Sequence, residues 1–348
     1  MRRELVTWSI VLGLIIAAFV TTVLIVNSTL FSSSGFVRSY LGALARHDMP
    51  SALQIADIHL AEEHGASSDD GSGATPIDTT GAGSMLLAGS HDLLRPSALS
   101  TIENIALAER TVNANGTETV TFVFDLDGNT SRSTFTVERD GSRFGVFADW
   151  KFVTPPLSIV RLTVANAQGF TANGSEFVTP TQDTPSPYVV LTPSSFDISH
   201  TSTFLTAEPI RVSATDPGKT VRARLDVVAN DAMVAQVQRE VNDYLDECAT
   251  QVVLLPTGCP FGQPMANRIV TTPEWSMATY PEVTLVPGSA TGSWLMPATD
   301  GAAHLTVDVR SIFDGSVSTF DEGVDFTASY LVTFMPEDEL LITAQYPN

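Results

Sequence analysis

Apolar residues dominate the start of the chain without interruption. From Leu5 to Val26 the sequence has 22 residues without a charged side chain, and Arg2 and Arg3 precede them. A helix of that length rises about 33 Å, enough to cross the hydrocarbon core of a bilayer. The pattern predicts a transmembrane signal anchor over 1–26, followed by a polar spacer over 27–35. Because basic flanks stay on the cytoplasmic side, we expect a cytoplasmic N-terminus and an extracellular remainder in the cell membrane.

A cleaved secretory signal is the alternative interpretation of this segment. The apolar core of such a signal usually has about 7–15 residues and ends at a cleavage site of the A-x-A type. Here the apolar run is longer, and no such site directly follows Val26. These differences favour an uncleaved single-pass anchor with only Met1 to Glu4 in the cytoplasm.

After the spacer, the pattern of apolar residues takes a helical period. Phe36, Tyr40 and Leu44 recur at four-residue spacing and predict an amphipathic helix, and Asp48 is a suitable N-cap for a second helix. Residues 62–92 are rich in Gly, Ser, Thr and Asp, which predicts a disordered insertion.

Three antiparallel strands are expected next. Phe122 and Phe124 belong to a run in which apolar and polar residues alternate, and Asp127-Gly128 and Asp140-Gly141 have the composition of tight turns. The sequence therefore predicts a first domain over 36–153, in which two helices precede a sheet.

No helical period is visible in the middle of the chain. From 157 to 229, short β-type runs are separated by turn residues such as Asn173-Gly174 and Asp216-Pro217-Gly218. We expect a small β-sandwich-like module here, joined to the first domain through Thr154-Pro155-Pro156.

The last part, 230–348, repeats the order of helix and sheet. Met233, Val237 and Val241 form a four-residue ladder behind Asn230 or Asp231, either of which can cap the helix. Alternating runs then predict strands at Val283 and Leu285, Leu305 to Val309, Phe326 to Phe334 and Leu340 to Ala344. The expected fold class is α+β, with two helix-on-curved-antiparallel-sheet domains flanking the β module.

Charge narrows the range of partners. Without its first four residues the chain has 16 basic and 38 acidic residues, a net charge of −22. Such a surface repels phosphate backbones and anionic lipid headgroups, so no nucleic-acid partner is expected. Lys151 and Lys219 are the only lysines, and neither lies in a P-loop or an S-x-x-K motif. No motif implies a cofactor or a metal ion.

Two cysteines agree with an extracytoplasmic location. Cys248 and Cys259 are separated by ten residues, which fits no C-x-x-C redox or zinc pattern. In an oxidising compartment, one structural disulfide that closes a short loop is expected. A zinc pair is the alternative, but no histidine lies between His200 and His304 to complete it.

The opening of the first domain resembles nuclear-transport-factor-2-like domains, whose first helix often carries a Y-L-x-A-L-x-x-x-D-x-x-x-A-L pattern. The matching residues are Tyr40, Leu41, Ala43, Leu44, Asp48, Ala52 and Leu53. The resemblance implies a cystatin-like α+β fold for the first and third domains. It implies no particular function, because this fold carries enzymes and non-catalytic modules alike.

The plan of the whole chain is similar to that of the teicoplanin-resistance-associated single-pass membrane proteins of Gram-positive bacteria. These also combine one anchor helix, small β modules and a C-terminal nuclear-transport-factor-2-like domain. The resemblance implies a bacterial cell-envelope location. It does not extend to a cytoplasmic zinc-ribbon segment, which this chain lacks before its apolar run.

Candidate site residues follow from the cavity that such folds can enclose. In the third domain we expect Tyr244, Trp294, His304 and Tyr330 to line a ligand-binding cavity, and no catalytic residue is assigned. In the first domain, Tyr40 is better explained as core. Asp48 is better explained as a helix cap.

Three functions are compatible with these patterns. The favoured one is a non-enzymatic, membrane-anchored extracytoplasmic protein that presents binding modules to another envelope protein or to a wall component. Its contact with the lipid bilayer would be made through residues 5–26. The second is an enzyme or small-molecule binder that uses a nuclear-transport-factor-2-like cavity. The third is a structural subunit of an envelope complex, with the anchor helix itself as the contact.

Overall fold

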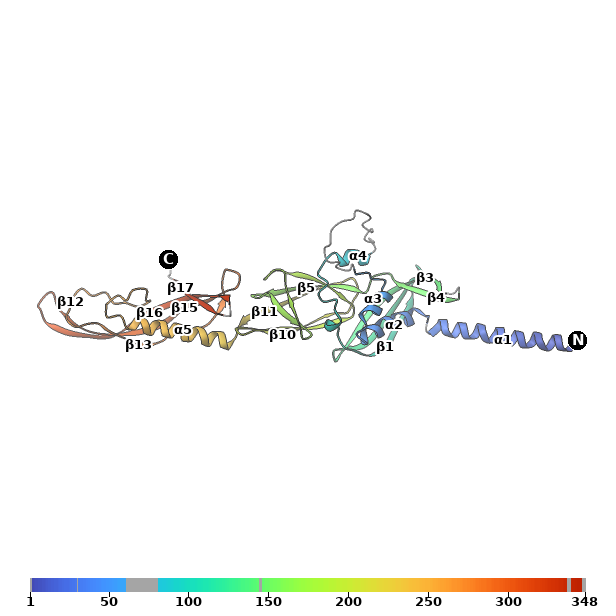
Figure 1. Cartoon of the computed structure of the whole chain (residues 1–348), viewed down its shortest axis with the longest axis horizontal. Helices are drawn as coiled ribbons and strands as arrows, with labels where there is room; N and C mark the ends of the chain where they lie inside the picture. Colours follow the sequence, from blue (N-terminus) through green and yellow to red (C-terminus); the bar gives the residue numbers. More distant parts are fainter. Residues whose placement is uncertain (1, 30, 61–80, 144–145, 337–338, 346–348) are drawn as a thin grey trace. The chain divides into compact units, whose positions relative to one another are not determined.

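The computed structural model describes residues 2–29, 31–60, 81–143, 146–336 and 339–345 (Figure 1). The chain divides into two compact units, and strands β5, β9, β10 and β11 contribute residues to both. The first unit contains Met1–Val164, Gly169–Ser199 and Pro209–Leu225, and the second contains Ala165–Gln168, His200–Glu208 and Asp226–Asn348. The three domain boundaries expected from the sequence group the residues differently and stay predictions.

The first unit begins with a long helix. Helix α1 (Arg2–Thr29) covers the apolar run, so the helix predicted there is confirmed. Every described side chain from Leu12 to Thr22 is exposed. Within the parts of the chain that the structure describes, none of the helices is both long and apolar enough to cross a membrane. The membrane-spanning role of α1 therefore stays a prediction.

Two short helices follow, as the sequence predicts. Helix α2 (Ser33–Ala45) starts after Ser32, whose hydroxyl accepts a hydrogen bond from the Gly35 amide, and helix α3 (Met49–Ile55) is capped by Asp48. The spacer predicted over 27–35 is too long, because α1 continues to Thr29 and α2 begins at Ser33.

The helices lie beside a four-stranded antiparallel sheet (Figure 1). Its strands are β1 (Ile102–Val112), β2 (Glu118–Leu126), β3 (Asn129–Arg143) and β4 (Phe147–Phe152), in that order. The turn predicted at Asp127-Gly128 is confirmed, since both residues have positive φ and join β2 to β3. The buried face of β2, with Val120, Phe122 and Phe124, packs in one core with the apolar face of α2.

One expectation for this region is wrong, and a second concerns residues that the structure describes only in part. No turn forms at Asp140-Gly141, because β3 continues to Arg143 and accommodates Gly141, at φ 108°, in an irregularity of its pairing with β4. The disordered insertion predicted over 62–92 is ordered from Gly81 onward, while 61–80 lie outside the described residues. Helix α4 (Gly81–Leu86) packs against the core, and the Ser90 amide donates to the Pro187 carbonyl at 2.9 Å.

Residues 157–229 contain strands and no helix, as the sequence predicts, and the strands form a seven-stranded sheet in the order β7-β6-β9-β10-β11-β5-β8. That these residues form a separate module stays a prediction. The strands are β5 (Leu157–Ala165), β6 (Gly169–Ala172), β7 (Ser175–Val178), β8 (Ser186–Leu191), β9 (Ser194–Thr201), β10 (Leu205–Ala214) and β11 (Thr220–Ala229), and a short 3-10 helix, η1 (Pro96–Ala98), precedes β1. Leu157, Val189 and Leu191 pack in the same core as α2 and β2. Tyr40 is fully buried there and donates its hydroxyl hydrogen bond to the Thr192 carbonyl at 2.8 Å.

The second unit is built from one helix and a curved antiparallel sheet. Helix α5 (Asp231–Ala249) is capped by Asn230, whose side chain accepts from the Met233 amide, and its buried stripe contains Val237, Val241 and Leu245. The strands are β12 (Arg268–Ile269), β13 (Glu274–Thr279), β14 (Val286–Pro287), β15 (Ser293–Arg310), β16 (Val317–Phe334) and β17 (Leu340–Ala344). Figure 1 shows α5 lying along the sheet beside β13 and β15.

The α+β class with curved sheets is thus confirmed. The runs around Leu305, Phe326 and Leu340 form β15, β16 and β17 as predicted. The strand predicted at Val283 and Leu285 is wrong, because Val283 is buried in a loop and its amide donates to the Gln238 side chain at 2.9 Å.

The predicted disulfide between Cys248 and Cys259 is present. It ties the last turn of α5 to the loop that follows, with the two Cα atoms 5.8 Å apart.

Candidate functional site

Two of the four predicted cavity residues come together in the second unit. Tyr244 on α5 and Tyr330 on β16 meet edge to face, with ring centroids 6.2 Å apart. The Tyr244 hydroxyl donates a hydrogen bond to the Gly258 carbonyl. Both tyrosines line a cavity of about 230 Å³ next to the disulfide, together with Cys259 and Pro260.

The structure places the other two residues elsewhere. Trp294 is 1% exposed in the core. His304 lies on the face of β15 opposite to the buried Leu305, and its Nε2 is 2.8 Å from a carboxylate oxygen of Asp321. The expected set of four therefore does not converge on one cavity.

Aromatic side chains fill the interior between α5 and the sheet. Phe261 packs against Trp275 and Phe326, with ring centroids 5.1 and 5.5 Å away, and all three are buried. Among the described residues, no group of three His, Cys, Asp or Glu side chains is placed to hold a metal ion.

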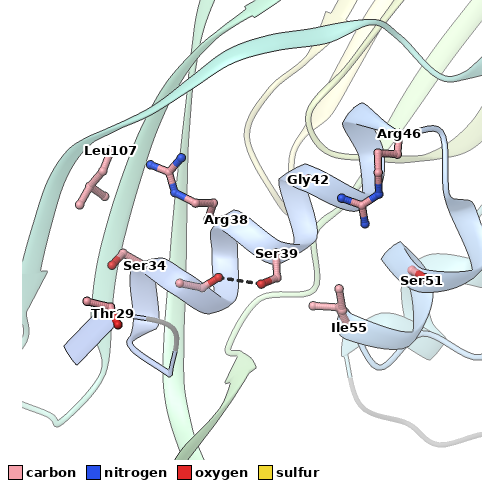
Figure 2. Close-up of a pocket in the computed structure, with 10 residues that line it drawn as sticks. Thr29, Ser34, Arg38, Ser39, Gly42, Arg46, Ser51, Ile55 and Leu107 are labelled. Carbon is pink, nitrogen blue, oxygen red and sulfur yellow. Dashed lines mark hydrogen bonds between the residues drawn. The ribbon is translucent and has the colours of Figure 1, made fainter. Parts of the chain in front are cut away.

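A larger cavity lies in the first unit, between α2, α3 and β1 (Figure 2). We call it the α2–α3 groove. Its volume is about 600 Å³, and it is lined by Thr29, Ser34, Gly35, Arg38, Ser39, Gly42, Arg46, Ser51, Ile55 and Leu107. None of these residues was expected from the sequence to form a site.

The positively charged side chains of the groove come from the exposed face of α2 and from its C-cap residue. Arg38, Gly42 and Arg46 follow one another at four-residue spacing, so they share one side of the helix. Val37, Tyr40 and Leu41 lie on the buried side. Gly42 leaves the floor open between the arginines, because a Cβ there would already come within 3.4 Å of Arg46 Nη1.

The two arginines differ in how they are held. Arg38 donates from Nη1 to the Ile105 carbonyl at 3.1 Å, and its guanidinium lies over the Phe122 ring, 5.5 Å from the centroid. The Arg46 guanidinium, drawn toward the middle of the groove in Figure 2, makes no hydrogen bond or ion pair with a residue that the structure describes. It is available to an external anion.

The stretch of sequence that supplies most of the groove lining is basic, in contrast to the chain as a whole. No carboxylate occurs between Glu4 and Asp48, so the charged side chains of α2 and its C-cap, Arg38 and Arg46, are both positive. The Asp48 side chain accepts from Ser51, and these hydrogen bonds, together with the charge of Arg46, lower the pKa of its carboxyl. This absence of carboxylates is the sequence signal that could have pointed to the groove.

The junction between α1 and α2 is fastened to the sheet by polar and aromatic contacts. Trp150 Nε1 donates to the Phe31 carbonyl at 2.8 Å, and the Phe31 ring stacks on Phe147 with centroids 4.5 Å apart. The Ser33 hydroxyl donates to Glu118, and Arg110 Nε donates to the same carboxylate oxygen at 2.7 Å. The residues at the start of α2 are therefore held against the same sheet whose strand β1 lines the groove.

This arrangement predicts a pH-dependent contribution of Glu118 to stability. Burial raises the pKa of its carboxyl. Hydrogen bonds from Arg110 and Ser33, together with the Arg110 charge, lower the pKa by more than burial raises it, so it lies below its ordinary value. Because the folded-state pKa is depressed, the contribution is complete above the unfolded pKa of about 4.3. It is lost as the pH falls through the folded pKa.

We expect Glu118→Gln to lower the free energy of unfolding by about 1–3 kcal/mol at neutral pH, since a charged hydrogen-bonded group is replaced. The difference from wild type should shrink when urea unfolding is repeated below the folded pKa. Glu109→Gln, at an exposed site nearby on β1, is the matched control and should have little effect. A Glu118→Gln difference that does not change with pH would contradict this explanation.

Comparisons with models of protein families, with characterised proteins and with solved structures give no match for this chain.

Proposed function

We propose that this is a single-pass, membrane-anchored extracytoplasmic protein that presents non-catalytic binding modules at the cell envelope. The observation that carries the proposal is the N-terminal segment, an apolar helix followed directly by a folded unit. The nuclear-transport-factor-2-like resemblance of the modules stays part of the proposal.

The character of α1 supports an anchor. In sequence, Leu5 to Val26 carries no charge, although the structure describes only part of its side chains. The described ones from Leu12 to Thr22 are exposed on all sides of the helix, among them Leu14 at 66%, Ile16 at 54% and Phe19 at 63%. A helix that is apolar all round is typical of a membrane span, since water solvates such a surface poorly.

Two further features support an extracytoplasmic location for the folded units. Arg2 and Arg3 precede the apolar run, which favours a cytoplasmic N-terminus. The disulfide between Cys248 and Cys259 is typical of proteins in oxidising compartments.

A binding role is favoured over an enzymatic one by the shape of the two candidate sites. The cavity beside Tyr244 and Tyr330 is about 230 Å³, smaller than the roughly 300–1,000 Å³ of most small-molecule sites. The α2–α3 groove is larger, but its two charged groups are arginines, which bind anions and do not exchange protons at neutral pH.

The anchor is tested by placing charges in the middle of α1. We expect the double variant Ile16→Asp and Phe19→Asp to leave the membrane fraction, because each carboxylate costs about 2.5–3.5 kcal/mol on insertion. The measurement is the share of the full chain that stays in the membrane pellet after an alkaline carbonate wash. Ile16→Leu and Phe19→Leu together form the matched control and should be retained like wild type.

Protease treatment of intact cells tests the orientation. With an extracytoplasmic C-terminal bulk, cleavage should reach both folded units without lysis. A wild-type chain that the carbonate wash removes, or one protected until the cells are lysed, would contradict the proposed function.

A further inference from the structure

The α2–α3 groove starts where the apolar run ends. Thr29 lines the groove, and Val26, the last residue of the run, lies three residues earlier, about 4.5 Å along the helix axis. The headgroup region of a bilayer extends roughly 5–8 Å beyond the hydrocarbon core on each side. If α1 crosses the membrane, as the proposed function has it, the groove opens at the depth of the headgroups.

The distribution of charge along the chain fits this depth. All of the carboxylates except Glu4 come at or after Asp48, whereas Arg38 and Arg46 are the charged residues between them. The part next to the membrane is thus positive, although the part outside as a whole has a net charge of −22. At physiological ionic strength, charges more than about 8 Å away are largely screened, so the nearby charges decide what the groove attracts. These include Arg38 and Arg46, which outnumber the Asp48 carboxylate that feels the charge of Arg46.

The chemistry of the lining selects a phosphate. A guanidinium presents parallel N–H donors that match the oxygens of a phosphate, and Arg46 has them available. Ile55 and Leu107 add an apolar wall, with Leu107 44% exposed on β1. Arginine beside exposed apolar surface suits a ligand that is anionic at one end and apolar at the other.

We propose that the α2–α3 groove binds the phosphate of an anionic lipid headgroup from the membrane that α1 enters. Arg46 is the principal phosphate ligand. Arg38, held by the Ile105 carbonyl and the Phe122 ring, supplies the second positive charge. This inference rests on the proposed anchor and adds the ligand class of the groove.

The test uses the full chain in nanodiscs of phosphatidylcholine, with or without phosphatidylglycerol. After transfer to mild detergent, native mass spectrometry measures how much of each lipid stays bound. Wild type should retain phosphatidylglycerol in preference to phosphatidylcholine. Because one basic residue near an anionic surface is worth about fivefold in affinity, Arg46→Gln should lose about fivefold and Arg38→Gln with Arg46→Gln about 25-fold.

Two controls separate a local site from a general effect. Arg132→Gln with Arg268→Gln removes the same charge from exposed positions outside the groove and should leave retention unchanged. Arg46→Gln alone removes no side-chain hydrogen bond to a residue that the structure describes, and urea unfolding of this variant checks that the fold is kept. Equal retention by wild type and the groove variants would overturn the proposal.

The source of the phosphate and the anchor are tested separately. Inorganic phosphate or glycerol phosphate that displaces phosphatidylglycerol at concentrations similar to the lipid would overturn the lipid assignment and indicate a site for free oxyanions. The carbonate wash reports on the anchor alone, and the groove variants should stay in the membrane. A wild type that stays in the membrane without retaining anionic lipid would refute this inference and leave the proposed function intact.

Discussion

Replacement of Trp294 by alanine is expected to lower the free energy of unfolding of the second unit by about 3–5 kcal/mol, the largest effect of any single substitution considered for this protein. Trp294 is 1% exposed and is the largest fully buried side chain. The loss combines the transfer of the ring to the core with the cavity that a truncated side chain leaves behind.

Trp294→Phe should cost much less than Trp294→Ala. The indole Nε1 has no hydrogen-bond partner among the described residues, so phenylalanine removes ring volume without breaking a hydrogen bond within the protein. Hydrogen exchange of the amides in β15 and β16 measures the effect on this unit separately from the first unit.

Phe313→Ala is the control for the loss of an aromatic ring. Phe313 is 97% exposed in the turn between β15 and β16, and truncation there should change stability by no more than about 0.5 kcal/mol. Equal effects at Trp294 and Phe313 would show that burial of Trp294 does not stabilise the unit.

The second large effect is expected at the disulfide. Replacing Cys248 and Cys259 together by serine should lower the free energy of unfolding by about 3 kcal/mol, because the unfolded chain regains the entropy that the closed loop withholds. Exchange should accelerate most between Thr250 and Gly262, the loop that the bond ties to α5.

A reducing agent provides the matched comparison. It should reproduce the loss of stability in wild type and leave the double serine variant unchanged. Hydrogen bonds between the Gln251 side chain and the backbone of Thr257 also hold the loop. If these hydrogen bonds alone hold the loop in place, the double serine variant would be as stable as wild type. The stabilising role assigned to the disulfide would then be wrong.

Local sequence predicted the elements whose side chains alternate between core and solvent. The run through Leu305 and Val309 became β15 because one face of the strand is buried. Strand β1 was missed because nearly all of its side chains are exposed, which leaves no alternation to detect. It forms because β2, the next strand along the chain, offers its backbone hydrogen bonds, and this pairing does not depend on which side chains β1 buries.

The same limit explains the misplaced turn and strand. An Asp-Gly pair suits both a turn and an irregular strand, and only pairing with β4 decides that Gly141 stays within β3. In the sequence, Val283 and Leu285 alternate with polar residues as in a strand. In the structure, Val283 is buried without belonging to one. Its position is decided by a hydrogen bond to Gln238 on α5.

The candidate site could be predicted only in part. Tyr244 and Tyr330 line one cavity, as expected. Tyr330 lies on a stripe that the sequence identifies as buried, whereas Tyr244 is partly exposed beside the buried Leu245. Trp294 and Leu305 are an odd number of residues apart, so in a regular strand their side chains would point to opposite faces. Both are buried because an irregularity between Met296 and Thr299 shifts the alternation of β15. Such a shift depends on the pairing with β16 and is not visible in the order of residues.

Sequence by itself determined the apolar N-terminal helix, the caps of α3 and α5, the disulfide pair and the α+β class, because each depends on neighbouring residues or on the compartment. Only the tertiary structure decided that Arg38 and Arg46 form a groove. On α2 alone they resemble two solvated side chains, and it takes walls from α3 and β1 to enclose them. Long-range packing creates the cavity, so the run without carboxylates before Asp48 indicates the charge of the groove but not its walls.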